Sequence, residues 1–295
     1  MERKLNLDIP RNIVEFEALI DKILPKKIFY RLLLRGKGLE FDGYRNFGQD
    51  EDASSIDWKA SVRSNTLLAK QYIEERDIKI MFIIDIGENM IFGSEEKLKC
   101  EYCAEMVAAL ANVMLSSGDK VGFIFFNNKI TKIRMPEGGG KQFNIFVYEI
   151  SNAENYGGYS DINEVLGSII QRLNPSISLM ILISDFIKVN EGSRKNFQEL
   201  AHICETIAMM IKDPLDKTLP EINKEIVIEN PNTGERMIVN PKIAKKSYEK
   251  NAAEQTALVK DIFQDSNIDF LELETDRPFP MDLALFLKRR IERRY

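Results

Sequence analysis

Two aspartates follow the longest apolar runs of the sequence. The run at 78–84 is broken only by Lys79 and ends at Asp85, and the run at 179–183 is followed by a serine and Asp185. Such runs are typical of strands buried on both faces of a parallel sheet, where ligands bind at the carboxyl ends of the strands. Two carboxylates there could hold Mg²⁺, which prefers oxygen ligands, or form a metal-free hydrogen-bonded cluster, because buried carboxylates need partners.

The elements that position these aspartates alternate between strand and helix from residue 77 onward. The spacing of apolar residues predicts strands at 78–84, 121–126, 130–135 (at an edge), 179–183, 206–211 and 269–273, and helices at 95–116, 141–151, 161–173, 193–204, 242–265 and 281–294. Such alternation predicts a mostly parallel sheet covered by helices on both faces. Residues 213–241 break the rhythm and predict an inserted β-hairpin, with strands near 225–229 and 236–240.

The first 76 residues follow a different pattern. Apolar spacing predicts a helix over 11–35 that is interrupted at Pro25, a polar loop over 36–65 and a strand over 67–73. We therefore expect an N-terminal helical and extended segment over 1–76 and an α/β domain over 77–295.

Composition excludes several classes of function. The net charge of −5 argues against a general nucleic-acid binder. Three cysteines cannot complete a disulfide framework, and no apolar leader or membrane-length run is present, so a cytoplasmic protein without a membrane span is expected.

The motifs for common enzyme chemistries are incomplete. Cys100 and Cys103 form a C-x-x-C pair that we expect a turn or more inside a helix, where thiols lack the activation that redox chemistry needs. The sole histidine, His202, is expected to be structural, and it leaves no His-based triad or multi-His zinc site. The glycines before Lys141 lack the Ser or Thr of a phosphate-binding loop. We expect no catalytic residues.

Two blocks of residues carry a family resemblance. The first holds Tyr44, Arg45, Asp57, Trp58, Lys59, Arg63 and the segment 70–76, and the second holds the segments 85–90, 118–122, 184–185 and 213–220. Over roughly residues 30–290 they resemble the domain-of-unknown-function-58 (DUF58) family, in which a signature segment precedes a von Willebrand factor A-like (vWA) domain. The resemblance implies a Rossmann-like α/β fold for the second part of the chain.

The resemblance also implies a metal-ion-dependent adhesion site, in which vWA domains hold Mg²⁺ or Mn²⁺ with oxygen ligands. Its aspartate positions fall on Asp85 and Asp185, and its threonine position falls on Ser160. Where the family has two serines, this chain has Asn89, which offers an amide oxygen, and Gly87, which offers no side-chain ligand. We expect a degenerate site that binds Mg²⁺ or Mn²⁺ weakly or not at all, and no certain cofactor.

By the same resemblance, the chain is a non-catalytic adaptor that acts beside a MoxR-type AAA+ ATPase in the assembly or maturation of protein complexes. The expected partner-binding face comprises Asp85, Gly87, Asn89, Met90, Ser160, Asp161 and Asp185. The signature segment is expected to brace or extend this face, with Trp58 as a buried anchor. Two alternatives stay open: a divalent-metal-dependent hydrolase that uses Asp85 and Asp185, and a purely structural subunit.

Overall fold

A six-stranded sheet forms the centre of the fold. The computed structural model describes residues 4–23, 39–48, 55–74, 78–229 and 236–292. The strands of the sheet are β3 (Lys79–Asp85), β4 (Lys120–Phe126), β5 (Ile130–Glu137), β6 (Leu179–Ser184), β7 (Glu205–Lys212) and β10 (Asp269–Glu274). Their order is β10-β7-β6-β3-β4-β5, with β5 as an antiparallel edge strand and the others parallel. Numbered along the chain, this is the 3-2-1-4-5-6 order of a doubly wound fold, which confirms the Rossmann-like prediction.

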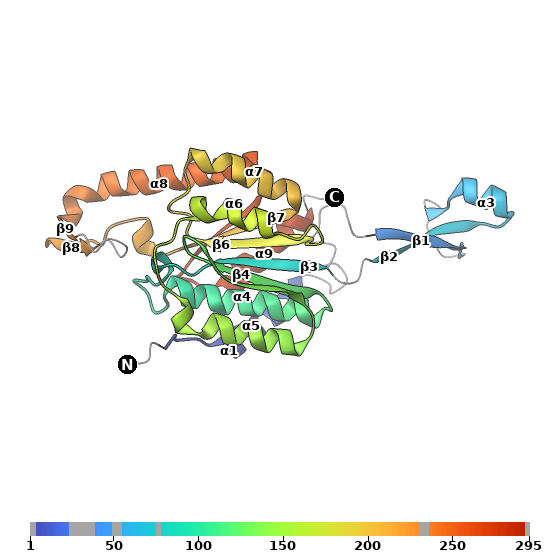
Figure 1. Ribbon diagram of the computed structural model, residues 1–295, viewed down its shortest axis with the longest axis horizontal. Coiled ribbons are helices and arrows are strands. Elements are labelled where there is room, and N and C mark those ends of the chain that lie inside the picture. The colour runs from blue at the N-terminus through green and yellow to red at the C-terminus, as the bar shows by residue number, and fades with distance from the viewer. Residues whose placement is uncertain (1–3, 24–38, 49–54, 75–77, 230–235, 293–295) are drawn as a thin grey trace.

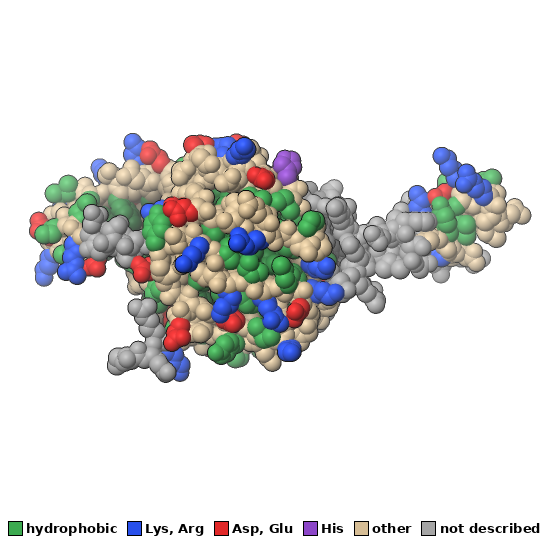
Figure 2. All heavy atoms as spheres, viewed as in Figure 1, with side chains coloured by type: hydrophobic (Ala, Val, Ile, Leu, Met, Phe, Trp, Pro, Cys, Tyr) green, Lys and Arg blue, Asp and Glu red, His purple; other side chains and the backbone are tan. Residues whose placement is uncertain are grey.

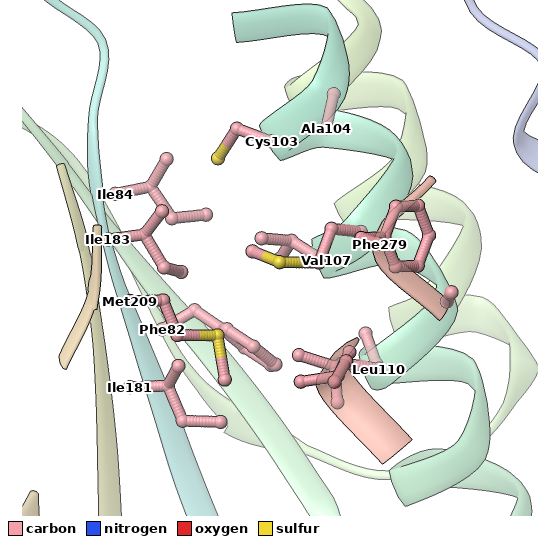
Figure 3. Close-up of a cluster of buried hydrophobic side chains, with 14 of the residues drawn as sticks. Phe82, Ile84, Cys103, Ala104, Val107, Leu110, Ile181, Ile183, Met209 and Phe279 are labelled. Carbon is pink, nitrogen blue, oxygen red and sulfur yellow. The ribbon is translucent and has the colours of Figure 1, made fainter. Parts of the chain in front are cut away.

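Helices cover both faces of the sheet (Figure 1). One layer consists of α1 (Ile9–Ile23), α4 (Lys99–Ser116), α5 (Gly140–Ser151) and α9 (Phe279–Glu292), and the other of α6 (Ile162–Arg172), α7 (Arg194–Ile203) and α8 (Pro241–Asp265). Alternate residues of the inner strands β3, β4, β6 and β7 enter opposite cores because side chains alternate along a strand. Figure 3 shows Phe82 and Ile84 of β3 facing Val107 and Leu110 of α4.

Helix α4 is buried almost all round because the N-terminal part of the chain covers it. Helix α1 packs against both α4 and α9. Before α1, the backbone N–H groups of Asn6 and Asp8 donate to the carboxylates of Glu101 and Glu105, at 2.6 and 2.5 Å. The part of the predicted helix 11–35 beyond Ile23 lies outside the described residues.

The signature segment folds into a small unit rather than the predicted polar loop. Strands β1 (Leu39–Asn46) and β2 (Leu68–Glu74) pair antiparallel, and α3 (Trp58–Ser64) lies between them in the chain. The Asp57 carboxylate caps α3 by accepting from the N–H groups of Lys59 and Ala60 at 3.0 and 3.1 Å. Within the described residues, the loop prediction was wrong over β1 and α3. Strand β1 is stabilised by pairing with a distant strand, which local composition does not reveal.

The predicted insertion is a two-stranded hairpin of β8 (Ile226–Glu229) and β9 (Arg236–Val239). Its turn, residues 230–235, lies outside the described residues. Within the described part of the chain, no helix combines the length and apolar character needed to cross a bilayer.

Candidate functional site

The carboxylate of Asp85, at the end of β3, accepts four hydrogen bonds from the protein. Its Oδ1 accepts from the backbone N–H of Gly87 at 2.9 Å and from Ser160 Oγ at 2.8 Å. Its Oδ2 accepts from Asn89 Nδ2 at 3.0 Å and from Ser184 Oγ at 2.6 Å. Two carboxylate oxygens offer about four acceptor positions in total. Protein donors therefore occupy the acceptor positions of this buried side chain.

Local structure explains how these donors converge. Ser184 is the last residue of β6, the strand beside β3, and the 3-10 helix η2 (Glu88–Met90) turns Asn89 back toward Asp85. Ser160 stands just before α6, whose first turn is capped by the Asp161 carboxylate. The site lies at the switch point between β3 and β6, where doubly wound sheets open a crevice.

Gly87 is required where it stands. A Cβ atom at this position would lie 2.3 Å from Ser160 Cβ and 2.6 Å from Asn89 Oδ1. Real Cβ atoms do not approach other atoms so closely, so a serine at position 87 would displace Ser160 or Asn89. The close position of Ser160 is therefore possible only because residue 87 is a glycine and not the serine of the family.

Asp185 is paired with a buried lysine that the sequence interpretation missed. Lys99, the first residue of α4, places its Nζ 2.9 Å from Asp185 Oδ2 and 3.0 Å from Asp216 Oδ2. Next to Asp185, Phe186 adopts a φ of 54°, held by packing of its ring against Phe263. Strained residues of this kind need support from their surroundings, and here the strain accompanies the turn that leads away from Asp185.

Asp213 organises the neighbouring loop. It is fully buried, accepts from Ser94 through both the backbone N–H at 2.7 Å and Oγ at 2.6 Å, and accepts from Thr275 Oγ1 at 3.2 Å. It also caps the 3-10 helix η5 (Pro214–Asp216), whose Asp216 accepts in return from the Asp213 N–H at 2.9 Å. Aspartates three residues apart around a proline are a readable capping pattern, and a lysine at the start of an apolar helix needs a buried partner. These were the available sequence signals.

Electrostatics couple the two aspartates. Burial and the charge of Asp185 raise the pKa of Asp85 above its usual range. Burial alone would lower the pKa of Lys99, but Asp185 and Asp216 outweigh it and raise that pKa, so the lysine stays charged. Lys99 thus supplies the positive charge that pairs with the carboxylates of Asp185 and Asp216.

These residues do not fit a divalent cation. Mg²⁺ demands six oxygen ligands in near-octahedral geometry, whereas Asp85 is occupied by protein donors and Asp185 by an ammonium group. Asn89 Oδ1 is buried and has no hydrogen-bond partner in the described structure. However, it is the amide nitrogen of this side chain, and not the oxygen, that faces Asp85. In the parts of the chain that the structure describes, no three His, Cys, Asp or Glu side chains are grouped to hold a metal.

The comparison with family models decides the family. A model described as "Protein of unknown function DUF58" matches residues 43–258. The chain belongs to the DUF58 family. A relative from Mycobacterium tuberculosis, "Uncharacterized protein Rv1480", is 21% identical over 261 residues, which cover 88% of this chain and 81% of the relative.

Solved structures resemble this DUF58 protein in fold. The hypothetical protein BatB from Bacteroides thetaiotaomicron has 12% identity and a TM-score of 0.45, covering 73% of this chain and 99% of its own. A von Willebrand factor type A structure from Catenulispora acidiphila has 11% identity and a TM-score of 0.41, and the match covers 77% of this chain and 44% of that structure's chain. The strand order described above carries the assignment of a vWA-like fold.

The DUF58 signature segment lies at the opposite end of the sheet from Asp85, which corrects the expectation that it braces that face. Strand β2 leads into the amino end of β3, whereas Asp85 stands at the carboxyl end (Figure 1). Tyr44 Oη donates to Asp57 Oδ2 at 3.3 Å, and Lys70 lies 3.6 Å from the same oxygen. Within the segment, Arg45, Lys59 and Arg63 are named in the signature but are separated from the Asp85 site by the length of the sheet.

Trp58 is 62% exposed, so the prediction of a buried anchor was wrong. Helix α3 buries Ser61 instead, and Trp58 stands on the outer side together with Val62. A large aromatic contributes apolar burial only where another layer covers it. In the described structure, no such layer covers this side of α3.

The remaining sequence predictions concern the cysteines and the histidine. Helix α4 begins at Lys99, so Cys100 lies in its first turn rather than further inside. Both thiols of the C-x-x-C pair are nevertheless buried, and burial raises the pKa of Cys100 to about 12. This opposes thiolate chemistry. His202 is exposed near the end of α7 rather than part of the core.

Proposed function

We propose that this DUF58 protein is a non-catalytic protein-interaction module whose binding face, at the carboxyl ends of β3 and β6, works without a metal ion. The observation that supports this most directly is the state of the two aspartates. Asp85 accepts four protein hydrogen bonds, and Asp185 is neutralised by Lys99. The loops of the face therefore have internal partners where a vWA site would use a cation.

Exposed apolar side chains around the site support a protein ligand. Phe92 follows η2, Tyr159 precedes Ser160 and Ile187 follows Phe186, and all three are exposed. Lys188 lies over the Tyr159 ring and Lys99 over the Phe92 ring, at 5.4 and 5.7 Å from the ring centroids. Aromatic residues are enriched in protein interfaces and in their hot spots. A pocket of about 480 Å³ lies beside η2 and is lined in part by Glu88 and Ile91, so this face also has a concave part.

The proposed partner is a MoxR-type AAA+ ATPase, and the proposed role is in the assembly or maturation of protein complexes. Membership of the DUF58 family supports this choice through the resemblance described above. The chain would act as the adaptor, and ATP hydrolysis by the ATPase would supply the free energy for assembly or maturation.

The binding experiment uses the purified MoxR-type ATPase of the same organism. We expect binding with the same affinity in EDTA and in Mg²⁺ when nucleotide is absent. We expect Ile187→Ala to weaken binding by at least about tenfold, or about 1.4 kcal/mol, as for a hot-spot side chain. The matched control is Ile203→Ala, an exposed isoleucine at the end of α7, beside the amino end of β7 and therefore at the opposite end of the sheet. Failure of the wild type to bind in any nucleotide state would reject the ATPase as partner.

The arrangement of Asp85 and Asp185 does not support the alternative of a metal-dependent hydrolase. Metal-assisted hydrolysis needs a cation and a water held beside free carboxylate oxygens. The oxygens of Asp85 accept from protein donors, and Lys99 lies against Asp185. A phosphatase and nuclease screen with Mg²⁺ and Mn²⁺ tests this alternative, and turnover that is lost in Asp85→Asn would support it.

A further inference from the structure

The inserted hairpin exposes apolar side chains that no described part of the chain covers. Val227 of β8 and Ile238 of β9 pair across the hairpin and therefore lie on the same face of it. These two side chains and Ile243 in the first turn of α8 are between 62% and 80% exposed. Together with Lys242 and Lys246 of α8 we call them the hairpin surface. Figure 2 shows hydrophobic and basic side chains together at this end of the molecule. Large exposed apolar patches mark interaction sites on soluble proteins.

The hairpin surface belongs to the same end of the molecule as the Asp85 site. The insertion begins directly after β7, which runs parallel to β3 and β6, so it leaves the sheet at the carboxyl edge (Figure 1). An isolated two-stranded hairpin is only marginally stable in water. A partner that covers its apolar side chains would therefore stabilise it.

The start of the insertion, at η5 (Pro214–Asp216), which we call its root, contacts the candidate site. Asp216 lies 3.0 Å from Lys99 Nζ, which also binds Asp185. On the other side of the root, Tyr248 Oη donates to the Leu215 carbonyl at 2.7 Å. Lys99 thus joins the loop that holds Asp185 to the start of the insertion, and a single partner could contact both surfaces.

We propose that the hairpin surface docks a partner protein that presents an apolar groove bordered by carboxylates. This inference rests on the proposed function and names the second contact surface of the same interaction. The hydrophobic side chains would enter the groove, and the two lysines would face its acidic border. Contacts of this composition bind through a small number of buried apolar anchors.

Charge identifies the chemistry of the partner. Lys242 and Lys246 are exposed on either side of Ile243 and have no ion pair among the described residues, whereas Lys245 is paired with Glu221 and Arg236 with Glu229. Two unpaired cations beside an apolar side chain match an acidic, apolar surface. In a two-fold contact with a second copy, like charges would approach each other, which disfavours self-association.

An anionic membrane fits this surface less well. Recognition of anionic lipids uses clusters of about four to eight Lys or Arg residues. The hairpin surface offers two unpaired lysines on a chain whose net charge is −5. The observations therefore favour a protein partner, and lipid binding becomes an outcome of the test.

The variant Ile243→Asp tests the inference with little risk to the fold. An aspartate in the first turn of α8 is favoured by the helix dipole, and Ile243 is largely exposed. The matched control is Val14→Asp, at a residue that is 66% exposed on α1. We expect Ile243→Asp to weaken binding of the purified MoxR-type ATPase at least about tenfold, and Val14→Asp to leave it unchanged, with both variants folded by circular dichroism. Equal affinity of the two variants would overturn the inference.

A second measurement separates this inference from the choice of partner. If the wild type does not bind the ATPase, the proposed partner is wrong, and a photo-crosslinking amino acid at position 243 is then compared with one at position 14 in living cells. A protein cross-linked only from position 243, identified by mass spectrometry and attached next to an acidic apolar groove, supports the hairpin surface. Crosslinks to a second copy, binding of phosphatidylglycerol vesicles, or no product specific to position 243 would each overturn it.

Discussion

The ammonium group of Lys99 lies 2.9 Å from the carboxylate of Asp185, although 86 residues separate them in the sequence. Both side chains are buried, at 1% and 3% exposure. The same ammonium reaches Asp216, 117 residues further along the chain than Lys99. One lysine therefore joins the first turn of α4, the loop after β6 and the root of the inserted hairpin.

Replacing this lysine should be strongly destabilising. Lys99→Met keeps the length of the side chain but leaves the buried carboxylate of Asp185 and that of Asp216 without their cation. Removal of one partner of a buried ion pair costs about 3–5 kcal/mol. We expect a loss of this size in the free energy of unfolding, measured by urea denaturation at neutral pH.

The control for Lys99→Met also removes the two carboxylate charges, of Asp185 and Asp216, that have lost their cation. In the triple variant Lys99→Met, Asp185→Asn, Asp216→Asn, the buried negative charges are gone, so a large part of the lost stability should return. If the triple variant is no more stable than Lys99→Met, the lysine stabilises the fold through packing rather than through its charge.

Divalent cations should not stabilise the wild-type protein. A micromolar site at a hundredfold excess of ligand over its dissociation constant would add about 2.7 kcal/mol to the free energy of unfolding. We expect the melting temperature to be the same in EDTA, Mg²⁺ and Mn²⁺, because Asp85 and Asp185 are occupied by protein donors. A rise of several degrees with either cation that disappears in Asp85→Asn would contradict the metal-free interpretation.

Gly87→Ala should destabilise the protein although it adds only one methyl group. The new Cβ would meet Ser160 Cβ at 2.3 Å, and overpacking of this kind costs about 1–3 kcal/mol. Gly167 of α6 provides the matched control because a Cβ there meets nothing within 4 Å. Gly167→Ala should stabilise the helix by about 0.5–1 kcal/mol. Thermal melts that move in the same direction for both variants would refute this account of position 87.

The single tryptophan allows a direct optical check of the signature segment. Trp58 is exposed on the outer side of α3, so its fluorescence in the native protein should resemble that of a free tryptophan derivative in water and change little in wavelength on unfolding. Acrylamide should quench it efficiently in the native state. Strongly blue-shifted native emission with poor quenching would mean that the side chain is covered.

The sequence by itself determined the architecture of the α/β domain. Apolar residues that recur with the period of a strand or a helix report which face of each element is buried, and this signal is local. It located the six strands of the sheet, the edge position of β5 and the inserted hairpin. It also placed Asp85 and Asp185 at one edge, because the carboxyl ends of parallel strands meet there.

Only the tertiary structure decided what surrounds those aspartates and what covers the signature segment. Nothing local to Lys99 specifies that its ammonium binds Asp185 and Asp216, because those contacts depend on how distant elements are packed. In the same way, Trp58 is an aromatic residue whose burial depends on whether another layer covers α3, and none in the described structure does. Periodicity reports the burial of an element's own face, whereas the partner of a buried charge is fixed by packing between elements far apart in the chain.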